Sequence, residues 1–156
     1  MDLQSHFLNI VFKLIRNPAK DMKDFRVISY ERAQYGDGIK TGYVKDLGKP
    51  SDTETFVRVV ASAGERTFEF ITGKKFDKKM GYLSIDGKYI PLENSDNPYV
   101  LLFDAYLSGK YNNLVTAETS IFGWKLTELI IKRNAELTYY KPGKKVLEYV
   151  FPEHIL

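Results

Sequence analysis

Residues 55–92, TFVRVVASAGERTFEFITGKKFDKKMGYLSIDGKYIPL, carry the clearest fold signal in the sequence. Short runs rich in β-branched and aromatic residues alternate there with polar or glycine-containing segments. Such runs are typical of strands, and Asp86-Gly87 between two apolar runs is a strong hairpin signal, because both residues tolerate positive φ. The stretch therefore predicts antiparallel strands joined by tight turns, with strands at 55–61, 66–72, 82–85 and 88–92.

The preceding segment extends this pattern toward the N-terminus. Residues 25–30 and 42–47 form two further predicted strands, and Gly36-Asp37-Gly38 lies between them. We interpret this short glycine-rich stretch as a turn rather than as a cradle for phosphate. Residues 25–92 together are predicted to form an antiparallel β-meander.

Helices are predicted on both sides of the meander. Residues 1–17 place apolar side chains on one helical face, and Pro18 ends that helix because the residue before a proline avoids the α region. After the meander, Asn97 is a suitable N-cap and Pro98 a favoured first helical residue. The segment 97–156 is predicted to contain helices at 98–108, 114–122 and 125–137, followed by a hairpin of 137–140 and 146–151.

The predicted fold class is thus α+β in a single domain over residues 1–156. It consists of an N-terminal helix, an antiparallel β-meander, and a helical segment with a C-terminal β-hairpin. The order of short helix, glycine turn, longer helix and hairpin resembles the winged helix-turn-helix family, which implies docking on DNA by a recognition helix and a wing. Phe122, Trp124 and Leu129 fit the helix-turn-helix spacing, whereas Glu118 and Lys132 depart from it.

Positive charge is concentrated near the C-terminus, although the net charge of the chain is only +3. Residues 124–145 contain six Lys and Arg side chains against two glutamates. DNA-binding modules use such side chains to neutralise phosphates and release counterions. We predict three groups of nucleic-acid-binding residues: Lys125, Lys132 and Arg133 on the last helix, Lys141, Lys144 and Lys145 on the hairpin, and Lys74, Lys75 and Lys78 in the loop after residue 72.

That loop, residues 73–79, places Phe76 among lysines. Two interpretations stay open. In the first, the lysines contact phosphates while Phe76 stacks on a base. In the second, the loop is an ordinary solvated connection, and Phe76 folds inward against the protein.

Catalytic signals are sparse. The chain has no Cys, and its two histidines lie near opposite termini. Asp86-Gly87-Lys88 matches half of a metal-dependent nuclease motif, with Glu69 or Asp77 as a second carboxylate. A hairpin turn already explains Asp86-Gly87, however. We therefore predict no enzymatic activity, no metal site and no cofactor.

The leading hypothesis is a non-enzymatic binding protein that contacts nucleic acid through the basic, winged-helix-like C-terminal segment. The alternative is a protein-binding accessory or inhibitor module that uses a tyrosine-rich sheet surface. The apolar run at residues 7–12 is too short for a signal peptide or a membrane span, so a soluble cytoplasmic protein without a membrane partner is expected. The tyrosines in or near predicted strands are Tyr30, Tyr35, Tyr43, Tyr82, Tyr89, Tyr139, Tyr140 and Tyr149.

Overall fold

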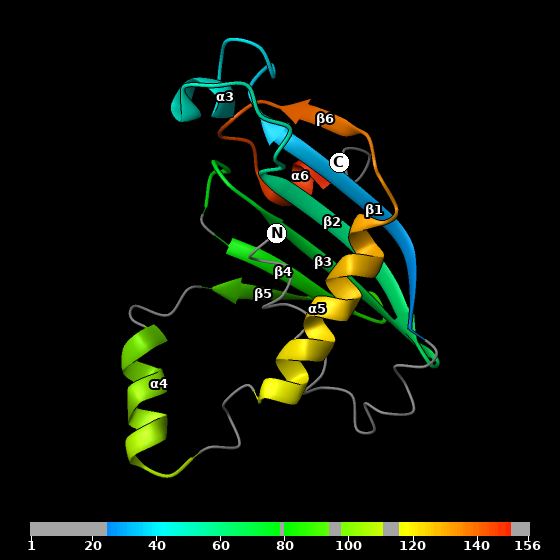
Figure 1. The fold of residues 1–156 in the computed structure, drawn as a ribbon, viewed down its shortest axis with the longest axis vertical. Coiled ribbons are helices and arrows are strands. Elements are labelled where there is room, and N and C mark those ends of the chain that lie inside the picture. The colour runs from blue at the N-terminus through cyan, green and yellow to red at the C-terminus, as the bar shows by residue number, and fades with distance from the viewer. Residues whose placement is uncertain (1–24, 79, 94–97, 111–115, 151–156) are drawn as a thin grey trace.

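The computed structural model describes residues 25–78, 80–93, 98–110 and 116–150. Its main element is a six-stranded mixed sheet with the order β5-β4-β3-β2-β1-β6 (Figure 1). The strands are β1 (Arg26–Tyr35), β2 (Phe56–Ala63), β3 (Arg66–Gly73), β4 (Met80–Ile85), β5 (Lys88–Glu93) and β6 (Leu137–Tyr140). The described helices are α3 (Tyr43–Leu47), α4 (Pro98–Leu107), α5 (Ala117–Ile131) and α6 (Val146–Val150).

The first five strands are antiparallel neighbours, whereas β6 lies parallel to β1 at the edge of the sheet. The turn between β4 and β5 has positive φ at both Asp86 (51°) and Gly87 (81°), which is the geometry of a tight two-residue hairpin. The predicted Asp86-Gly87 hairpin is therefore confirmed. Pro91 lies in the edge strand β5, where a missing N–H is tolerated.

Each face of the sheet has its own apolar core, because successive side chains of a strand point to opposite faces. Phe56 and Val57, adjacent in β2, enter different clusters. The helix α5 covers one face and buries Leu126 and Ile130 there (Figure 1). The buried strand residues of this first core include Val27, Val57, Val59, Ala61, Phe68, Phe70 and Leu83.

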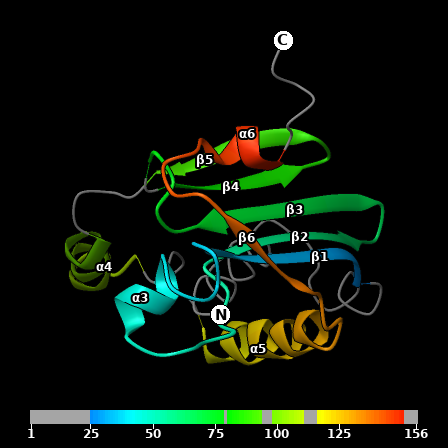
Figure 2. The same cartoon turned by 90° about the horizontal axis from the view of Figure 1, so that it is seen from above.

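The second core lies on the opposite face, on the side of α6; Figure 2 shows α5 and α6 on opposite sides of the sheet. It is mostly aromatic and occupies the end of the sheet at which β1, β3 and β6 all finish. Its buried members are Ala33, Tyr35, Phe56, Ile71, Phe76, Tyr140 and Val146.

The predicted fold class is wrong. The described chain is a mostly-sheet protein built on a six-stranded mixed sheet, not a helix followed by an antiparallel meander and a winged-helix segment. The strands predicted at 55–61, 66–72, 82–85 and 88–92 are present with small differences in their bounds, and a helix begins at Pro98 as predicted. The strand predicted at 25–30 is also present, but β1 continues five residues further, to Tyr35. The predicted helix at 1–17 lies outside the described residues.

The strand predicted at 42–47 is instead the helix α3. Gly48 ends this helix in the left-handed conformation, and its N–H donates to the carbonyls of Val44 and Lys45 at 3.0 and 3.2 Å. Such a glycine cap satisfies carbonyls that a helix leaves unpaired at its C-terminus. A five-residue helix is too short to show a helical period, which explains the error.

The predicted helix-turn-helix is one continuous helix, α5, which runs through Gly123. Glycine costs about 1 kcal/mol relative to alanine in a helix interior, a penalty that tertiary packing readily outweighs. Gly123 is buried, and its carbonyl also accepts the Thr127 hydroxyl at 2.9 Å. The helix ends at Ile131, six residues before the predicted end at Leu137.

The predicted C-terminal hairpin does not form. Residues 137–140 are a strand, but they pair in parallel with β1, from Arg32↔Leu137 to Tyr35↔Tyr140. Residues 146–150 form the helix α6 rather than a second strand. The described residues 116–150 therefore contain neither a recognition helix that follows a turn nor a wing. The resemblance to winged helices does not hold.

Candidate nucleic-acid interface

The fold joins the two lysine-rich loops that the sequence separates. The N–H of Gly143 donates to the Lys75 carbonyl at 2.7 Å, and the N–H of Asp77 donates to the Lys144 carbonyl at 3.1 Å. The loop after β3 and the loop after β6 thus lie side by side. We name the six exposed lysines of these loops the lysine cluster: Lys74, Lys75, Lys78, Lys141, Lys144 and Lys145.

An aromatic platform supports the lysine cluster. Phe76 stacks on Tyr140 with ring centroids 4.8 Å apart and an interplanar angle of 8°, and it also contacts Phe56 at 5.8 Å. Gly73 makes this possible, because a Cβ there would lie 2.3 Å from the Phe76 ring. Phe76 is only 9% exposed, so it folds inward and does not serve as a stacking platform for a base.

The hydroxyl of Tyr140 ties three segments together beneath the cluster. It donates to the Lys74 carbonyl at 2.7 Å and lies 3.1 Å from Oγ1 of Thr55. The N–H of Lys74 donates in turn to the Thr55 carbonyl at 2.9 Å. The β3–β4 loop is therefore anchored to both β6 and the approach to β2.

We predict that Tyr140→Phe lowers the free energy of unfolding by about 1–3 kcal/mol, because it removes both the part-buried hydrogen bond to the Lys74 carbonyl and the buried contact with the Thr55 hydroxyl. Urea unfolding followed by circular dichroism measures this change. Tyr139→Phe is the matched control, since its side chain is 49% exposed and its loss of a hydroxyl should alter stability by less than about 0.5 kcal/mol. Equal stabilities of the two variants would contradict the anchoring role.

Four lysines of the cluster, Lys74, Lys78, Lys141 and Lys144, form no ion pair with a carboxylate of the described residues. Lys75 lies 3.8 Å from Asp46, and Lys145 lies 2.7 Å from Glu148. The hydrogen bond to Glu148 raises the pKa of Lys145, so this ammonium stays charged at neutral pH. A third carboxylate, Asp77, lies in the same loop and also raises the pKa of Lys145, so the surface has six ammonium groups against three carboxylates and is net positive.

The loop between β1 and α3 lies at the same end of the sheet (Figure 1). Oδ1 of Asp37 accepts the N–H groups of Thr41, Ile39 and Lys40 at 2.8–2.9 Å, which holds the pKa of Asp37 far below its usual range. Asp37 thus occupies the N–H groups that a phosphate would need, in agreement with the turn interpretation.

Tyr35 links this loop region to the lysine cluster. Its hydroxyl donates to Oδ2 of Asp46 at 2.8 Å, and Nζ of Lys75 lies 5.9 Å from the centre of its ring. Burial, together with Asp46, raises the pKa of Tyr35 to about 12, so the hydroxyl remains protonated. Lys40, in the loop before α3, and Lys45, in α3, are also exposed. The sequence did not single out Lys45 because residues 42–47 were predicted to be a strand of the sheet.

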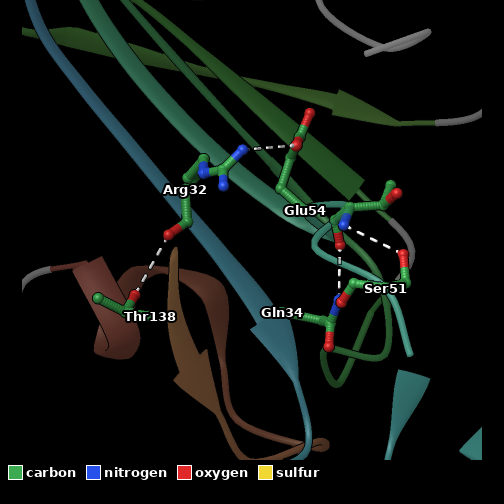
Figure 3. A network of polar contacts seen from close by, with 6 residues as sticks. Arg32, Gln34, Ser51, Glu54 and Thr138 are labelled. Atoms are coloured by element: carbon green, nitrogen blue, oxygen red, sulfur yellow. Dashed lines mark hydrogen bonds and ion pairs between the residues drawn. The ribbon is translucent and has the colours of Figure 1, made fainter. Parts of the chain in front are cut away.

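Figure 3 shows how the polar side chains of β1 fix its neighbours. Gln34 is fully buried, and its amide donates to the carbonyls of Ser51 and Thr53 at 3.0 and 2.8 Å. The Thr138 hydroxyl donates to the Arg32 carbonyl at 3.3 Å. These contacts hold the 51–54 segment and β6 against β1, and so position the end of the sheet that carries the lysines.

The remaining predicted site residues, Lys125, Lys132 and Arg133, lie on or just after α5, which covers the other face of the sheet. The structure does not bring them together with the lysine cluster. The guanidinium of Arg133 donates to the Val27 carbonyl at 2.5 Å, which ties the end of α5 to β1. The sequence predicted that cations of a recognition helix and of a basic wing dock on DNA side by side, and this arrangement is wrong.

The residues of the nuclease-like motif have structural contacts. Oδ1 of Asp86 accepts the N–H of Thr67 at 2.9 Å. Glu69 accepts Nε of Arg58 at 2.6 Å and the hydroxyl of Tyr89, and Arg58 also bonds Glu31 at 3.1 Å. Within the described residues, no group of three or more His, Cys, Asp or Glu side chains is placed to hold a metal ion.

No protein-family model matches the chain, and no curated protein matches it. In the described part of the chain, no helix combines the length and apolar character that a membrane span requires.

Proposed function

We propose that this protein is a non-enzymatic binding protein that contacts nucleic acid through the lysine cluster. One observation carries the proposal: backbone hydrogen bonds join the loop after β3 to the loop after β6. Two modest basic segments thereby become one surface with six exposed ammonium groups.

Charge and rigidity both favour a polyanionic ligand. Each phosphate that a lysine neutralises releases condensed counterions, which is the main source of affinity in sequence-independent nucleic-acid binding. The loops are held by hydrogen bonds to Tyr140 and Thr55 and by the stacked Phe76, so little ordering of the backbone is needed on binding. Nucleic acid is an intracellular ligand, and the proposal accordingly places the protein in the cytoplasm.

The experiment is a fluorescence-anisotropy titration of labelled mixed-sequence DNA and RNA oligonucleotides near 0.1 M salt. The test variant carries Lys74→Glu, Lys78→Glu, Lys141→Glu and Lys144→Glu, and we expect it to bind about two orders of magnitude more weakly than the wild type. Its stability should hardly change, because exposed charges contribute little to folding.

The matched control carries Lys125→Glu and Lys132→Glu on the α5 side. The Debye length at 0.1 M salt is about 10 Å, so charges outside the interface should have little effect on affinity. If each substituted lysine lowered the affinity equally in both variants, net charge alone would drive binding. A wild type without affinity for either nucleic acid would remove the proposal.

The alternative, a protein-binding module that uses sheet tyrosines, has weaker support. Tyr35 and Tyr140 are buried, and Tyr30, Tyr43 and Tyr82 pack against the two cores. Among the strand tyrosines whose side chains are described, Tyr89 and Tyr139 are more than a third exposed. Absence of nucleic-acid affinity would make this alternative the leading function.

A further inference from the structure

We infer that the nucleic acid held by the lysine cluster is single-stranded, and that one of its bases stacks on the ring of Tyr139. This inference rests on the proposed function and specifies its ligand. It starts from β6, the edge strand whose last two residues are tyrosines with opposite environments: Tyr140 is 4% exposed, and Tyr139 is 49% exposed.

The ring of Tyr139 lies against backbone rather than in open solvent. A Cβ on Gly38 would lie 2.2 Å from the Tyr139 ring, so the ring rests directly on this glycine. Gly38 has a φ of 75°, in the left-handed region that glycine adopts without strain. The contact restrains one side of the ring, and half of the side-chain surface remains accessible. A restrained, exposed aromatic ring is a suitable platform for a nucleobase.

Two lysines lie close to this platform along the chain. Lys141 follows Tyr139 by two residues, about 7 Å along an extended chain. Lys40 follows Gly38 by two residues in the loop on which the ring rests. Tyr139 and Tyr140 are adjacent in β6, so their side chains point to opposite faces of the sheet, and Tyr140 lies beneath the lysine cluster. Because β6 is the edge of the described sheet, a single strand that passes around this edge can meet both the Tyr139 ring and the lysine cluster. Single-strand-binding proteins combine basic surface and aromatic ring in this way.

The elements around the lysine cluster do not suit the reading of base sequence in a duplex. Reading a major groove requires a helix or a two-stranded ribbon that enters it. The helices next to the cluster, α3 and α6, have five residues each, about 7.5 Å of helix. The longer α5 lies on the other face of the sheet, and its exposed side includes Trp124 and Leu129 at 55% and 46%.

The test compares four probes of about 16 nucleotides in the same titration: single-stranded DNA, single-stranded RNA, duplex DNA, and a single strand of abasic sites that keeps the phosphates but lacks bases. We expect the single strands to bind at least about tenfold more tightly than the duplex. Tyr139→Ala should weaken single-strand binding by roughly 5- to 150-fold, the range for one lost base–aromatic stack.

The abasic strand separates stacking from misfolding. Tyr139→Ala should leave affinity for it within about twofold, whereas a disturbed loop would weaken binding to every probe. Tyr139→Phe should retain single-strand affinity, and Tyr106→Ala on α4, a tyrosine that is 58% exposed, is the matched control. In Figure 1, α4 lies far from β6.

The inference would be overturned, and the proposed function left intact, by duplex binding as tight as single-strand binding or by an unchanged single-strand affinity of Tyr139→Ala. An equal loss on the abasic strand would also overturn it. A wild type that binds none of the four probes would instead remove the proposed function itself.

Discussion

Phe68→Ala is expected to lower the free energy of unfolding by about 3–5 kcal/mol, a large part of the stability of a domain of this size. Phe68 is 1% exposed and lies between Ala61 of β2 and Ile85 of β4, in the core that α5 covers. Removing its ring loses buried apolar area and leaves a cavity that flanking strands cannot close. Urea unfolding followed by circular dichroism measures the change.

Phe103→Ala on α4 is the control for Phe68→Ala, because it makes the same chemical change at a side chain that is 63% exposed. We expect its effect to stay within about 0.5 kcal/mol. If Phe68→Ala costs less than about 1 kcal/mol, or no more than its control, the packing of α5 on the sheet is not as described.

Gly42→Ala is expected to be strongly destabilising. Gly42 has a φ of 69°, and a Cβ there would lie 2.2 Å from the Tyr35 carbonyl oxygen, a backbone atom that cannot move aside. Gly42 combines this φ with a ψ of −132°, a conformation that glycine adopts but alanine avoids, so the substitution adds backbone strain to a steric conflict, each on the order of 1–3 kcal/mol. The free energy of unfolding of the variant measures the sum.

Gly48→Ala is the control for Gly42→Ala, because Gly48 also has a positive φ, 73°, but lies in the left-handed helical region, with a ψ of 10°, and has open space where its Cβ would lie. It should show the conformational cost alone, about 1–2 kcal/mol. The difference between the two variants measures the glycine-specific conformation of Gly42 together with its close contact with the end of β1. Equal costs would mean that the connection from β1 to α3 is looser than the structure has it.

Local signals predicted much of the sheet from the sequence. The Asp86-Gly87 turn was recognisable because its two residues and their apolar flanks define the hairpin by themselves. Alternation in residues 66–72 likewise predicted a strand, which is β3 (Arg66–Gly73). These features depend on contacts between residues close in sequence, for which periodicity and turn chemistry are informative.

Non-local pairing could not be predicted in the same way. The sequence predicts a strand at residues 137–140 and pairs it with the nearest apolar run, residues 146–151. The actual partner is β1, which lies more than 100 residues earlier. Gly123 was interpreted as a break because glycine is a poor helix former, yet the burial of Leu126 and Ile130 against the sheet outweighs that preference.

In the candidate site, too, local features follow from the sequence, whereas features that depend on non-local pairing do not. The sequence predicts all six lysines of the lysine cluster as nucleic-acid-binding residues in two separate loops. It does not decide whether Phe76 stacks on a base or folds inward. Their union into one surface depends on β6 lying parallel to β1, which brings the loop after β6 beside the loop after β3. The exposed ring of Tyr139 could not be distinguished from the buried ring of Tyr140 before the faces of β6 were known.

The salt dependence of binding to a single strand tests most directly whether the two loops form one nucleic-acid interface. The measurement compares the wild type with Lys74→Gln/Lys78→Gln, Lys141→Gln/Lys144→Gln and the combined variant. If all four lysines contact phosphates, each pair should reduce the log–log slope by about 1.4 and the combination by about 2.8, at about 0.7 per contact. A slope that stays unchanged, or that responds to one loop only, would contradict the joint interface.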